Sequence, residues 1–397
     1  MVEVCVSGYS VVPPSRARVD RGEEALTAEE YHARVLSGLM QSVGIVKEEL
    51  DGLNYALGLN RPLWPHALIW SGEVAQNLGL SPKFTFVSDH GGMSALNLVA
   101  QGYALIKSGY VDHVVLLGVD SPLTPAKPQG GYRLERTWRY ELNYELPLGM
   151  IGPLSEAALL ARRHIYERGT TAEQMGIVAV SQRKNASKNP WAYLKQPLTL
   201  DEYLKSPYLA EPIRMLDAVI PVNGGFALML SRLEEAARFT DKPVNIDGIE
   251  TQVNADPQNE LRDITRLSIP SARLFDKVDL GLDDIDFLEL YDDFTIVVLM
   301  QLEALGYAGD GGGRFVEKTS ITHDGDLPVN TGGGQLSGGQ AGTAGGFGLL
   351  VEAVQQLREE AGERQVKGAK RGLVTGLGCL GYNHNLVNTG VALLSRP

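Results

Sequence analysis

A thiol and a phenol, two side chains that can move protons, stand in distinctive settings in this sequence. Cys379 lies between glycines in GLGCLG, where a thiol beyond an expected strand is accessible to a ligand and its pKa responds to nearby helix dipoles and cations. Tyr291 opens the segment YDDF ahead of an expected helix. A phenol there can donate a proton near its ordinary state, or accept one if neighbours lower its pKa. These residues are the first candidates for acid–base chemistry.

Each candidate also has a purely structural interpretation. A lone cysteine is usually a small buried apolar residue, and we expect that role for Cys5 in the first strand. Asp292 and Asp293 are typical capping residues ahead of the helix at Thr295, and Asp292 is the one that we expect capping to hold. His384, in the polar segment after Cys379, belongs to a surface loop unless it takes part in acid–base chemistry.

The run from Leu327 to Gly348, LPVNTGGGQLSGGQAGTAGGFG, is too rich in glycine to be an ordinary strand or helix. Glycine lets the backbone approach a ligand closely and adopt positive φ. The amphipathic helical pattern that follows, from Leu349 to Ala361, would supply unpaired N–H groups at its start. A flexible linker is the alternative, but a linker is normally polar on both sides, whereas apolar elements flank this run. We therefore predict a site-forming loop.

Short β-branched runs alternate with longer helical patterns along the chain, which is typical of an α/β fold with buried sheets. The expected strands are Val2 to Val6, Phe84 to Val87, His113 to Gly118, Phe226 to Leu230, Val244 to Ile249, Phe287 to Leu290 and Gly372 to Thr375. The expected helices include Thr27 to Val43, Ala95 to Ser108, Leu154 to Glu167 and Thr295 to Leu305. Residues from about 121 to 221 are rich in Pro, Tyr, Arg and Lys, and we interpret them as an inserted cap. Two comparable halves then remain, 1–240 with the cap and 241–397.

Length and composition narrow the class of protein. With 397 residues, 44% of them hydrophobic, the chain can bury a large core. A net charge of -12 argues against a nucleic-acid surface or an anionic membrane surface. Two cysteines cannot build a disulfide framework, and no apolar run reaches the roughly 18 residues of a membrane helix. Because the N-terminus also lacks the layout of a secretory signal, we expect a cytoplasmic protein without membrane insertion.

Five segments, in order, resemble the thiolase superfamily, and within it the sterol-carrier-protein type and related thiolase-like proteins. They span residues 88–122, 152–192, 288–306, 327–346 and 376–381, and so cover nearly the whole length. The resemblance implies a five-layered αβαβα fold with two pseudo-duplicated halves, a homodimer, and a loop domain over the site. It also implies coenzyme A thioesters as substrates, with coenzyme A as part of the substrate and no permanently bound cofactor or metal.

The chain departs from thiolases at two of their catalytic positions. Where a thiolase carries its nucleophilic cysteine, ahead of the helix at Ala95, this chain has Asp89 with His90 beside it. A carboxylate there is stabilised by the helix dipole and is a poor acyl acceptor; its alternative role is helix capping. The histidine of the Gly-His-Pro motif falls on Gln340, an amide that can donate a hydrogen bond to an oxyanion but not exchange a proton.

Tyr291 stands where thiolases open their third motif with Asn or His. In this it resembles the steroid side-chain-cleaving aldolases of the superfamily, in which a tyrosine of a YDxF segment is implicated in proton transfer. Those aldolases carry a second tyrosine where this chain has Gln340. Cys379 matches the thiol that moves a proton at the substrate α-carbon in thiolases. The resemblance further implies a small partner with an OB-fold and a zinc ribbon, in a heterotetramer, with zinc only in that partner.

The leading hypothesis is a carbon–carbon lyase that cleaves a β-hydroxyacyl-CoA by retro-aldol chemistry. Tyr291, with Asp89 or His90, would be the base, and Cys379 the acid, with His384 as a secondary candidate. The pocket for the thioester enolate would be made by Gln340 and the loop residues Gly333, Gly334, Ser337, Gly338 and Gly339. Two alternatives stay open, a Claisen-type acyltransferase or thiolase acting on a β-ketoacyl-CoA, and a non-catalytic subunit or lipid-thioester carrier.

Basic residues of the cap are candidates to meet the phosphates of coenzyme A. They are Arg162, Arg163, His164, Lys184, Lys188 and Lys195. A solvated basic face is the ordinary interpretation of such a set, and the sequence does not choose among its members.

Overall fold

The structure is a computed structural model. It describes residues 2–17, 22–23, 25–62, 69–124, 143, 146–150, 152–254, 267–309, 311–381 and 385–397, with only the backbone described at 379–381 and 385–387.

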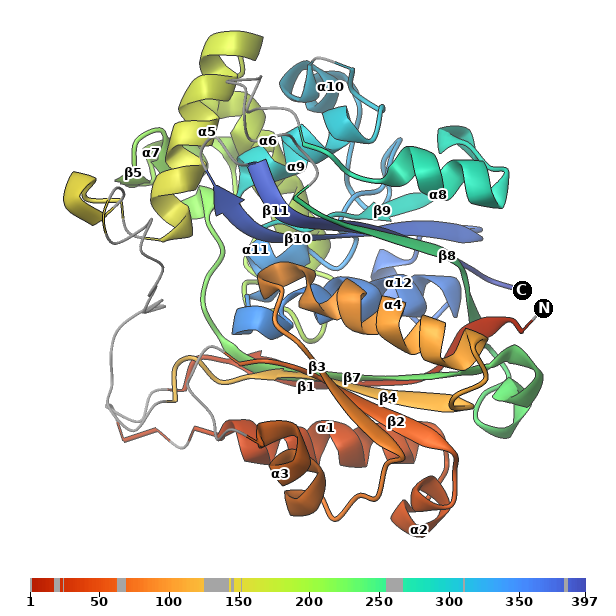
Figure 1. Cartoon of the computed structure of the whole chain (residues 1–397). Helices are drawn as coiled ribbons and strands as arrows, with labels where there is room; N and C mark the ends of the chain where they lie inside the picture. The colour runs from red at the N-terminus through yellow and green to blue at the C-terminus, as the bar shows by residue number, and fades with distance from the viewer. Residues whose placement is uncertain are drawn as a thin grey trace.

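Nine strands of the described chain join in one sheet, in the order β3-β2-β4-β7-β1-β8-β11-β10-β9. Only two residue pairs, Cys5 with Asn245 and Val6 with Val244, connect its two parts at β1 and β8. Figure 1 shows these parts as two levels with helices between them. The strands are β1 (Val4–Ser15), β2 (Tyr55–Asn60), β3 (Phe84–Ser88), β4 (His113–Asp120), β7 (Asn223–Arg232), β8 (Val244–Val253), β9 (Phe287–Glu289), β10 (Arg371–Gly381) and β11 (Asn385–Ser395).

The two parts of the sheet repeat one pairing scheme. In the first, β2 runs parallel to β4, which pairs antiparallel with β7, and β7 with β1. In the second, β9 runs parallel to β10, which pairs antiparallel with β11, and β11 with β8. This arrangement agrees with the predicted α/β fold class.

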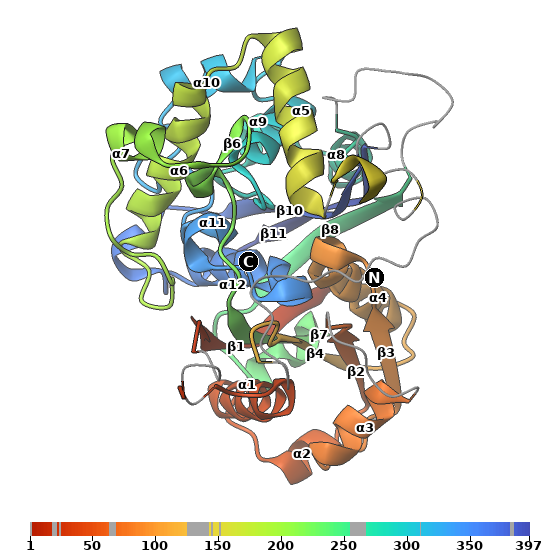
Figure 2. The same ribbon diagram turned by 90° about the vertical axis from the view of Figure 1, so that its left-hand side faces the viewer.

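Helices form the other three layers of the molecule (Figures 1 and 2). Helices α4 (Ser94–Lys107) and α12 (Gly346–Leu357) lie between the two levels of the sheet, and every residue of α12 except Gln355 is buried. A helix that is apolar on nearly all sides belongs in such a central layer. The outer layers contain α1 (Ala28–Ser42), α2 (Lys47–Asp51) and α3 (Trp70–Asn77) below, and α5 (Pro153–Arg168), α6 (Ala172–Ala186), α8 (Ser271–Val278), α9 (Thr295–Ala304) and α10 (Gly312–Lys318) above.

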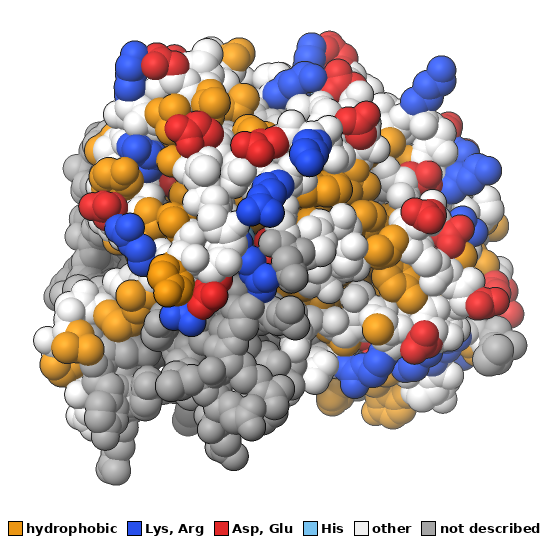
Figure 3. Space-filling view, turned by 90° about the horizontal axis from the view of Figure 1, so that it is seen from above, with side chains coloured by type: hydrophobic (Ala, Val, Ile, Leu, Met, Phe, Trp, Pro, Cys, Tyr) orange, Lys and Arg blue, Asp and Glu red, His pale blue; other side chains and the backbone are white. Residues whose placement is uncertain are grey.

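The stretch that we predicted as a cap holds α5, α6, α7 (Leu200–Lys205) and the hairpin of β5 (Tyr208–Ala210) and β6 (Ile213–Arg214). Figure 2 shows these elements together on the upper level. The domain boundaries themselves stay a prediction. On the face seen in Figure 3, acidic and basic side chains are interspersed. Within the described residues, no helix is both long and apolar enough to cross a membrane.

Several expected element boundaries were wrong, and two of them concern the site. Strand β1 continues from Val4 to Ser15, beyond the predicted end at Val6, because it stays paired with β7 as far as Ser15, which lies opposite Asn223. The glycine run is not free of helix, since it contains α11 (Gly334–Gly338) and the first residues of α12, which begins at Gly346 rather than Leu349. Burial between the sheet levels supplies packing that overrides the low helix propensity of glycine.

Candidate active site

Four segments that are distant in sequence meet at Gly92, in the turn (Gly91–Met93) that leads into α4. A Cβ atom at Gly92 would lie 2.0 Å from the Tyr291 hydroxyl oxygen and 2.5 Å from the Leu377 carbonyl oxygen. A Cβ atom at Gly346, where α12 begins, would lie 2.8 Å from the Gly92 carbonyl oxygen. Only glycine fits at such separations. The start of α4, the segment after β9, strand β10 and the glycine run therefore surround one point.

The backbone of Tyr291 is fixed from two sides. Its N–H donates to Thr375 Oγ1 of β10 at 2.9 Å, and its carbonyl oxygen accepts from Gln301 Nε2 of α9 at 2.6 Å. Thr375 Oγ1 in turn donates to Gln301 Oε1 at 2.6 Å. This closed set of buried hydrogen bonds orients the tyrosine at the end of β9, and the side chain is only 3% exposed.

The Tyr291 hydroxyl group belongs to a triangle with Gln340 and Asp293, which we call the phenol triad. Gln340 Nε2 donates to the Tyr291 oxygen at 3.1 Å and also donates to Asp293 Oδ1. The Tyr291 hydroxyl is hydrogen-bonded to the Asp293 carboxyl group, and burial raises the pKa of that carboxyl to about 7. The triad thus places a phenol beside a carboxyl group that titrates near neutral pH.

Gln340 is held by its backbone to the segment before β7. Its N–H donates to the Ile220 carbonyl oxygen at 2.9 Å, and its carbonyl oxygen accepts from the Val222 N–H at 3.0 Å. Because the two amide hydrogens of its side chain point to Tyr291 and Asp293, the predicted donation from Gln340 to a thioester oxyanion would require one of these bonds to break. The geometry favours a role for Gln340 as a hydrogen-bond donor to the Tyr291 hydroxyl oxygen.

Asp292 faces away from the triad. Its carboxylate oxygens accept the N–H groups of Gln335 and Leu336, at 2.8 and 3.0 Å, at the start of α11. The expected capping of the helix at Thr295 was therefore wrong, because the cap of α9 is Phe294, which makes no side-chain bond. Burial raises the pKa of Asp292 to about 8 despite these two bonds.

The backbone N–H groups of the glycine run are largely engaged within the protein. Besides those held by Asp292, the N–H of Gly333 donates to Asn330, that of Ser337 to Gly333, and that of Gly339 to Gln335. Gly333 and Gly339 adopt φ of +95° and +94°, which requires glycine. The role of Gly333, Gly334, Ser337, Gly338 and Gly339 in ligand binding stays a prediction. Because most N–H groups of the run already have acceptors, that role depends more on the shape of the loop than on unpaired N–H donors.

A buried polar network supports the loop from behind. Thr331 Oγ1 lies 2.7 Å from Glu289 Oε1 and 2.9 Å from Glu352 Oε1, and Arg364 Nε donates to both oxygens of Glu352 at 2.9 Å. Burial and the nearby Glu352 raise the pKa of Glu289 well above its usual range. Such a network is costly to disturb once its members are buried.

Asp89 and His90 lie between β3 and the turn at Gly91, close in sequence to Gly92. Asp89 pairs with Arg61 at 3.0 Å, and its side chain is 63% exposed, so it does not cap α4 as the structural interpretation suggested. His90 Nδ1 lies 3.1 Å from Asn97 Nδ2 and 3.2 Å from Ser88 Oγ. Since Asn97 donates to Nδ1, the neutral imidazole carries its proton on Nε2. The structure thus gives both side chains partners other than Tyr291.

The structure describes little of the two predicted acids, Cys379 and His384. The side chain of Cys379 and all of Tyr382, Asn383 and His384 fall outside the described residues. The backbone beside Cys379 does reach the site, because a Cβ atom at Gly378 would lie 2.1 Å from the His90 carbonyl oxygen. Cys5 is buried, as expected.

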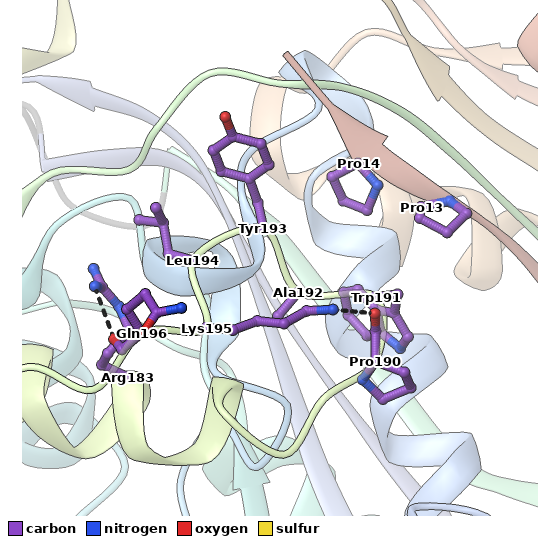
Figure 4. Close-up of a pocket in the computed structure, with 10 residues that line it drawn as sticks. All are labelled: Pro13, Pro14, Arg183, Pro190, Trp191, Ala192, Tyr193, Leu194, Lys195 and Gln196. Atoms are coloured by element: carbon purple, nitrogen blue, oxygen red, sulfur yellow. Dashed lines mark hydrogen bonds between the residues drawn. The ribbon is translucent and has the colours of Figure 1, made fainter. Parts of the chain in front are cut away.

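A groove of about 410 Å³ lies beside the glycine run (Figure 4). Pro13 and Pro14 of β1 and the segment from Pro190 to Gln196 line it together with Arg183. Its backbone contacts the glycine run directly, since the N–H groups of Tyr193 and Leu194 donate to Gly338 and Ser337. The groove thus borders the loop that carries Gln340 of the phenol triad.

Two cations of the groove differ from the other basic residues of the cap. Arg162, Arg163, His164, Lys184 and Lys188 each pair with a carboxylate, of Glu211, Glu167, Glu303, Asp324 and Glu363 respectively. In contrast, Lys195 Nζ donates to the Pro190 carbonyl oxygen and Arg183 Nε to Ser337 Oγ at 3.1 Å. Neither has a carboxylate partner among the described residues.

The comparisons with known proteins decide the family. Residues 252–388 match the Thiolase C-terminal domain-like family. Over 363 residues the chain is 31% identical to the acetyl-CoA acetyltransferase of Methanothermobacter thermautotrophicus, with 89% of each protein covered. The chain belongs to the thiolase superfamily. The resemblance inferred from the five segments is thereby confirmed.

Within the thiolase superfamily, the relatives include lyases as well as acyltransferases. The chain is 32% identical to the steroid side-chain-cleaving aldolase of Thermomonospora curvata over 306 residues, covering 72% of this chain and 76% of that protein. The solved structure of an Ltp2-ChsH2(DUF35) aldolase superposes with a TM-score of 0.82 at 25% identity, over 99% of this chain and 98% of that one. A monomeric SCP2-thiolase-like protein from Mycobacterium smegmatis, at 16% identity and a TM-score of 0.71, shares the fold over 99% of this chain and 77% of that one.

Two residues of the site were not predicted from the sequence. Asp293 was treated only as a capping residue, and Gly92 was not singled out. The pattern offered a weak signal for Asp293, because its neighbour Asp292 already satisfied a capping role. For Gly92 there was none beyond the glycine pair after His90.

Proposed function

We propose that this thiolase-superfamily enzyme cleaves a carbon–carbon bond of a β-hydroxyacyl-CoA by a retro-aldol reaction. The observation that carries the proposal is the phenol triad, which sets the Tyr291 hydroxyl group against Gly92, where α4 begins. At that helix start a thiolase presents a nucleophilic cysteine, and this chain has Asp89 and His90. A retro-aldol cleavage needs a base and an enolate pocket but no covalent acyl-enzyme.

The reaction assigned to this site balances as follows. The Tyr291 oxygen removes the proton of the β-hydroxyl group, a carbonyl group forms at the β-carbon, and the Cα–Cβ bond breaks. The bonding electrons pass into the thioester enolate. A proton added at the α-carbon then gives a shorter acyl-CoA, and the other product is a ketone or an aldehyde. Cys379 stays the predicted acid for this last step.

The groove in Figure 4 is the proposed site for the phosphates of coenzyme A. Arg183 and Lys195 are supported by their lack of carboxylate partners among the described residues, and cations of this kind bind phosphate groups. Trp191 and Tyr193 add aromatic surface beside them. The groove shares backbone hydrogen bonds with the glycine run, so a thioester chain bound there would lead toward the loop that carries Gln340.

We also propose a homodimer with a bound small subunit of the OB-fold and zinc-ribbon type. The solved aldolase structure is named for a DUF35 component as well as for Ltp2, which supports the second part. The edge strand β3 supports the first, because Phe84 and Val87 are 43% and 38% exposed on an edge that no described strand pairs with. The unpaired N–H and C=O groups of an exposed edge strand can pair with another chain.

An acyltransferase is the second candidate function, and the match to an archaeal acetyl-CoA acetyltransferase over 89% of both proteins favours it. The residues of the site speak against ordinary thiolysis, since Gln340 cannot exchange a proton as a histidine does. CoA-dependent cleavage of a β-ketoacyl-CoA would support this candidate.

The test of the lyase uses 17-hydroxy-3-oxo-4-pregnene-20-carboxyl-CoA, the β-hydroxyacyl-CoA named for a lyase of Mycobacterium tuberculosis that is 32% identical over 242 residues. Wild-type protein, alone and with a DUF35-family subunit, should release a ketone. Tyr291→Phe should lower kcat by roughly 100-fold or more, while coenzyme A binding measured by calorimetry stays unchanged. Full activity in Tyr291→Phe would overturn the base assignment, and coenzyme A binding without any turnover would favour a carrier.

A further inference from the structure

We propose that Asp293 is the proton acceptor behind Tyr291, so that its carboxylate takes the phenol proton while the phenol oxygen takes the proton of the substrate hydroxyl group. This inference rests on the proposed function and deepens it, because it explains how a tyrosine acts as a base. Asp293 does not need to touch substrate. It acts through the phenol and is therefore a positioning residue.

The directions of the hydrogen bonds in the phenol triad lead to this assignment. The amide nitrogen of Gln340 can only donate, and it donates to both Tyr291 and Asp293. The Tyr291 oxygen accepts that bond, which leaves its own proton for the bond to Asp293. The phenol proton is thus already directed at the carboxylate. Gln340 stabilises negative charge on whichever of the two oxygens carries it.

Asp293 has no other task in the described structure. It does not cap α9, whose cap residue Phe294 makes no side-chain bond, and it has no ion pair with any described cation. Its backbone is held in place because its carbonyl oxygen accepts the Val219 N–H at 3.0 Å. A carboxyl group with a fixed backbone and only the phenol and an amide as partners is suited to exchange a proton with the phenol.

The surroundings adjust the proton affinity of Asp293 in the required direction. Burial raises the pKa of Asp293 to about 7, so the carboxylate is a stronger proton acceptor than an exposed aspartate. Other acidic groups in this part of the fold are Asp292 beside it and Asp217, which accepts from Thr295 Oγ1 at 2.5 Å, next to Phe294. His90 is the titratable residue on the α4 side. Because the working form of Asp293 is the carboxylate, the rate should rise with pH through about 7.

Protons balance over the cycle. The substrate hydroxyl proton moves to the Tyr291 oxygen as the phenol proton moves to Asp293. The enolate carbon takes a proton from the acid of the site, for which Cys379 is the prediction. After the products leave, Asp293 loses its proton to water and the acid regains one, so no other reactant is needed.

The kinetic test compares Asp293→Asn with wild type and with Asp201→Asn, an exposed aspartate of α7 whose side chain is 72% exposed. On the steroid thioester, Asp293→Asn should lower kcat about 10- to 100-fold with little change in KM, and the ionisation near pH 7 should vanish from the kcat profile. Asp201→Asn should match wild type. A wild-type kcat and pH profile in Asp293→Asn would overturn the proposal.

A second measurement does not depend on activity. The infrared carbonyl band of protonated Asp293, assigned by its loss in Asp293→Asn, should persist to higher pH in Tyr291→Phe, because the phenol bond lowers the pKa of that carboxyl. No shift of the band would overturn the Tyr291–Asp293 pair, whether or not the protein cleaves the substrate. If the band shifts in Tyr291→Phe but wild type gives no cleavage, the pair is supported and the proposed function is contradicted.

Discussion

Asp292 and Asp293 are neighbours in sequence, and burial raises the pKa of both, yet their carboxyl groups have different partners and different roles. The carboxyl group of Asp292 accepts two backbone N–H groups of α11 and thereby holds the glycine run in place. Among the described side chains, the carboxyl group of Asp293 is hydrogen-bonded to those of the phenol triad alone. A raised pKa alone therefore does not mark a functional carboxyl group, and its partners distinguish the two.

The largest effect on stability is expected for Asp292→Ala. Two buried N–H groups, of Gln335 and Leu336, lose their acceptor, and each unpaired group costs about 1–3 kcal/mol. The free energy of unfolding, measured by urea titration, should fall by about 2–6 kcal/mol. Asp293→Ala also removes an acceptor, but from the side chains of Tyr291 and Gln340, which can rotate toward other partners as a backbone N–H group cannot, so the loss should be smaller, about 1–2 kcal/mol. Equal losses in the two variants would erase the distinction between the aspartates.

Gly92→Ala should come next. The added methyl group would lie 2.0 Å from the Tyr291 oxygen and must displace the phenol or the backbone, at about 1–3 kcal/mol of stability, together with a loss of lyase activity. Gly72→Ala in α3 is the matched control, because a Cβ atom there meets nothing within 4 Å. If Gly92→Ala behaves like the control, the convergence of segments on Gly92 is wrong.

The pH dependence of stability should separate the two carboxyl groups. Both pKa values are raised on folding, so their stabilisation is fully present below about pH 4 and is lost as pH rises through about 7 for Asp293 and about 8 for Asp292. Between pH 7 and 8, Asp292→Asn should reduce the decline of the free energy of unfolding, by about 1 kcal/mol per pH unit at most. Asp293→Asn should leave that interval nearly unchanged. The reverse order would contradict the assignment.

The smallest effect is expected in the groove. Lys195→Ala should raise the KM for the acyl-CoA about two- to fivefold, which corresponds to about 1 kcal/mol or less, without changing kcat. Lys188→Ala, whose lysine pairs with Glu363 at 2.5 Å, provides the control and should leave KM as in wild type. An unchanged KM in Lys195→Ala would remove this residue from the proposed coenzyme A site.

Much of the fold could be predicted from the sequence, because alternating β-branched runs and helical patterns report directly on buried strands and helices. Seven expected strands and the main helices match observed elements, and the family resemblance is confirmed. The site was harder to predict from the sequence, because its contacts join residues that are far apart in the chain. Nothing local shows that Gln340 bonds to Asp293, that Asp292 caps α11, or that Asp89 pairs with Arg61. The glycine run was recognised, but its engaged N–H groups and its internal helix follow from tertiary packing.

Mass spectrometry of the reaction products in deuterated water tests the lyase most directly. From 17-hydroxy-3-oxo-4-pregnene-20-carboxyl-CoA, without added coenzyme A, the account predicts a steroid ketone and a shorter acyl-CoA that carries one deuterium at its α-carbon. Tyr291→Phe and Asp293→Asn should give less of both products in the same ratio. Cleavage that requires free coenzyme A and yields two thioesters from a β-ketoacyl-CoA, with no ketone from the hydroxy substrate, would contradict it.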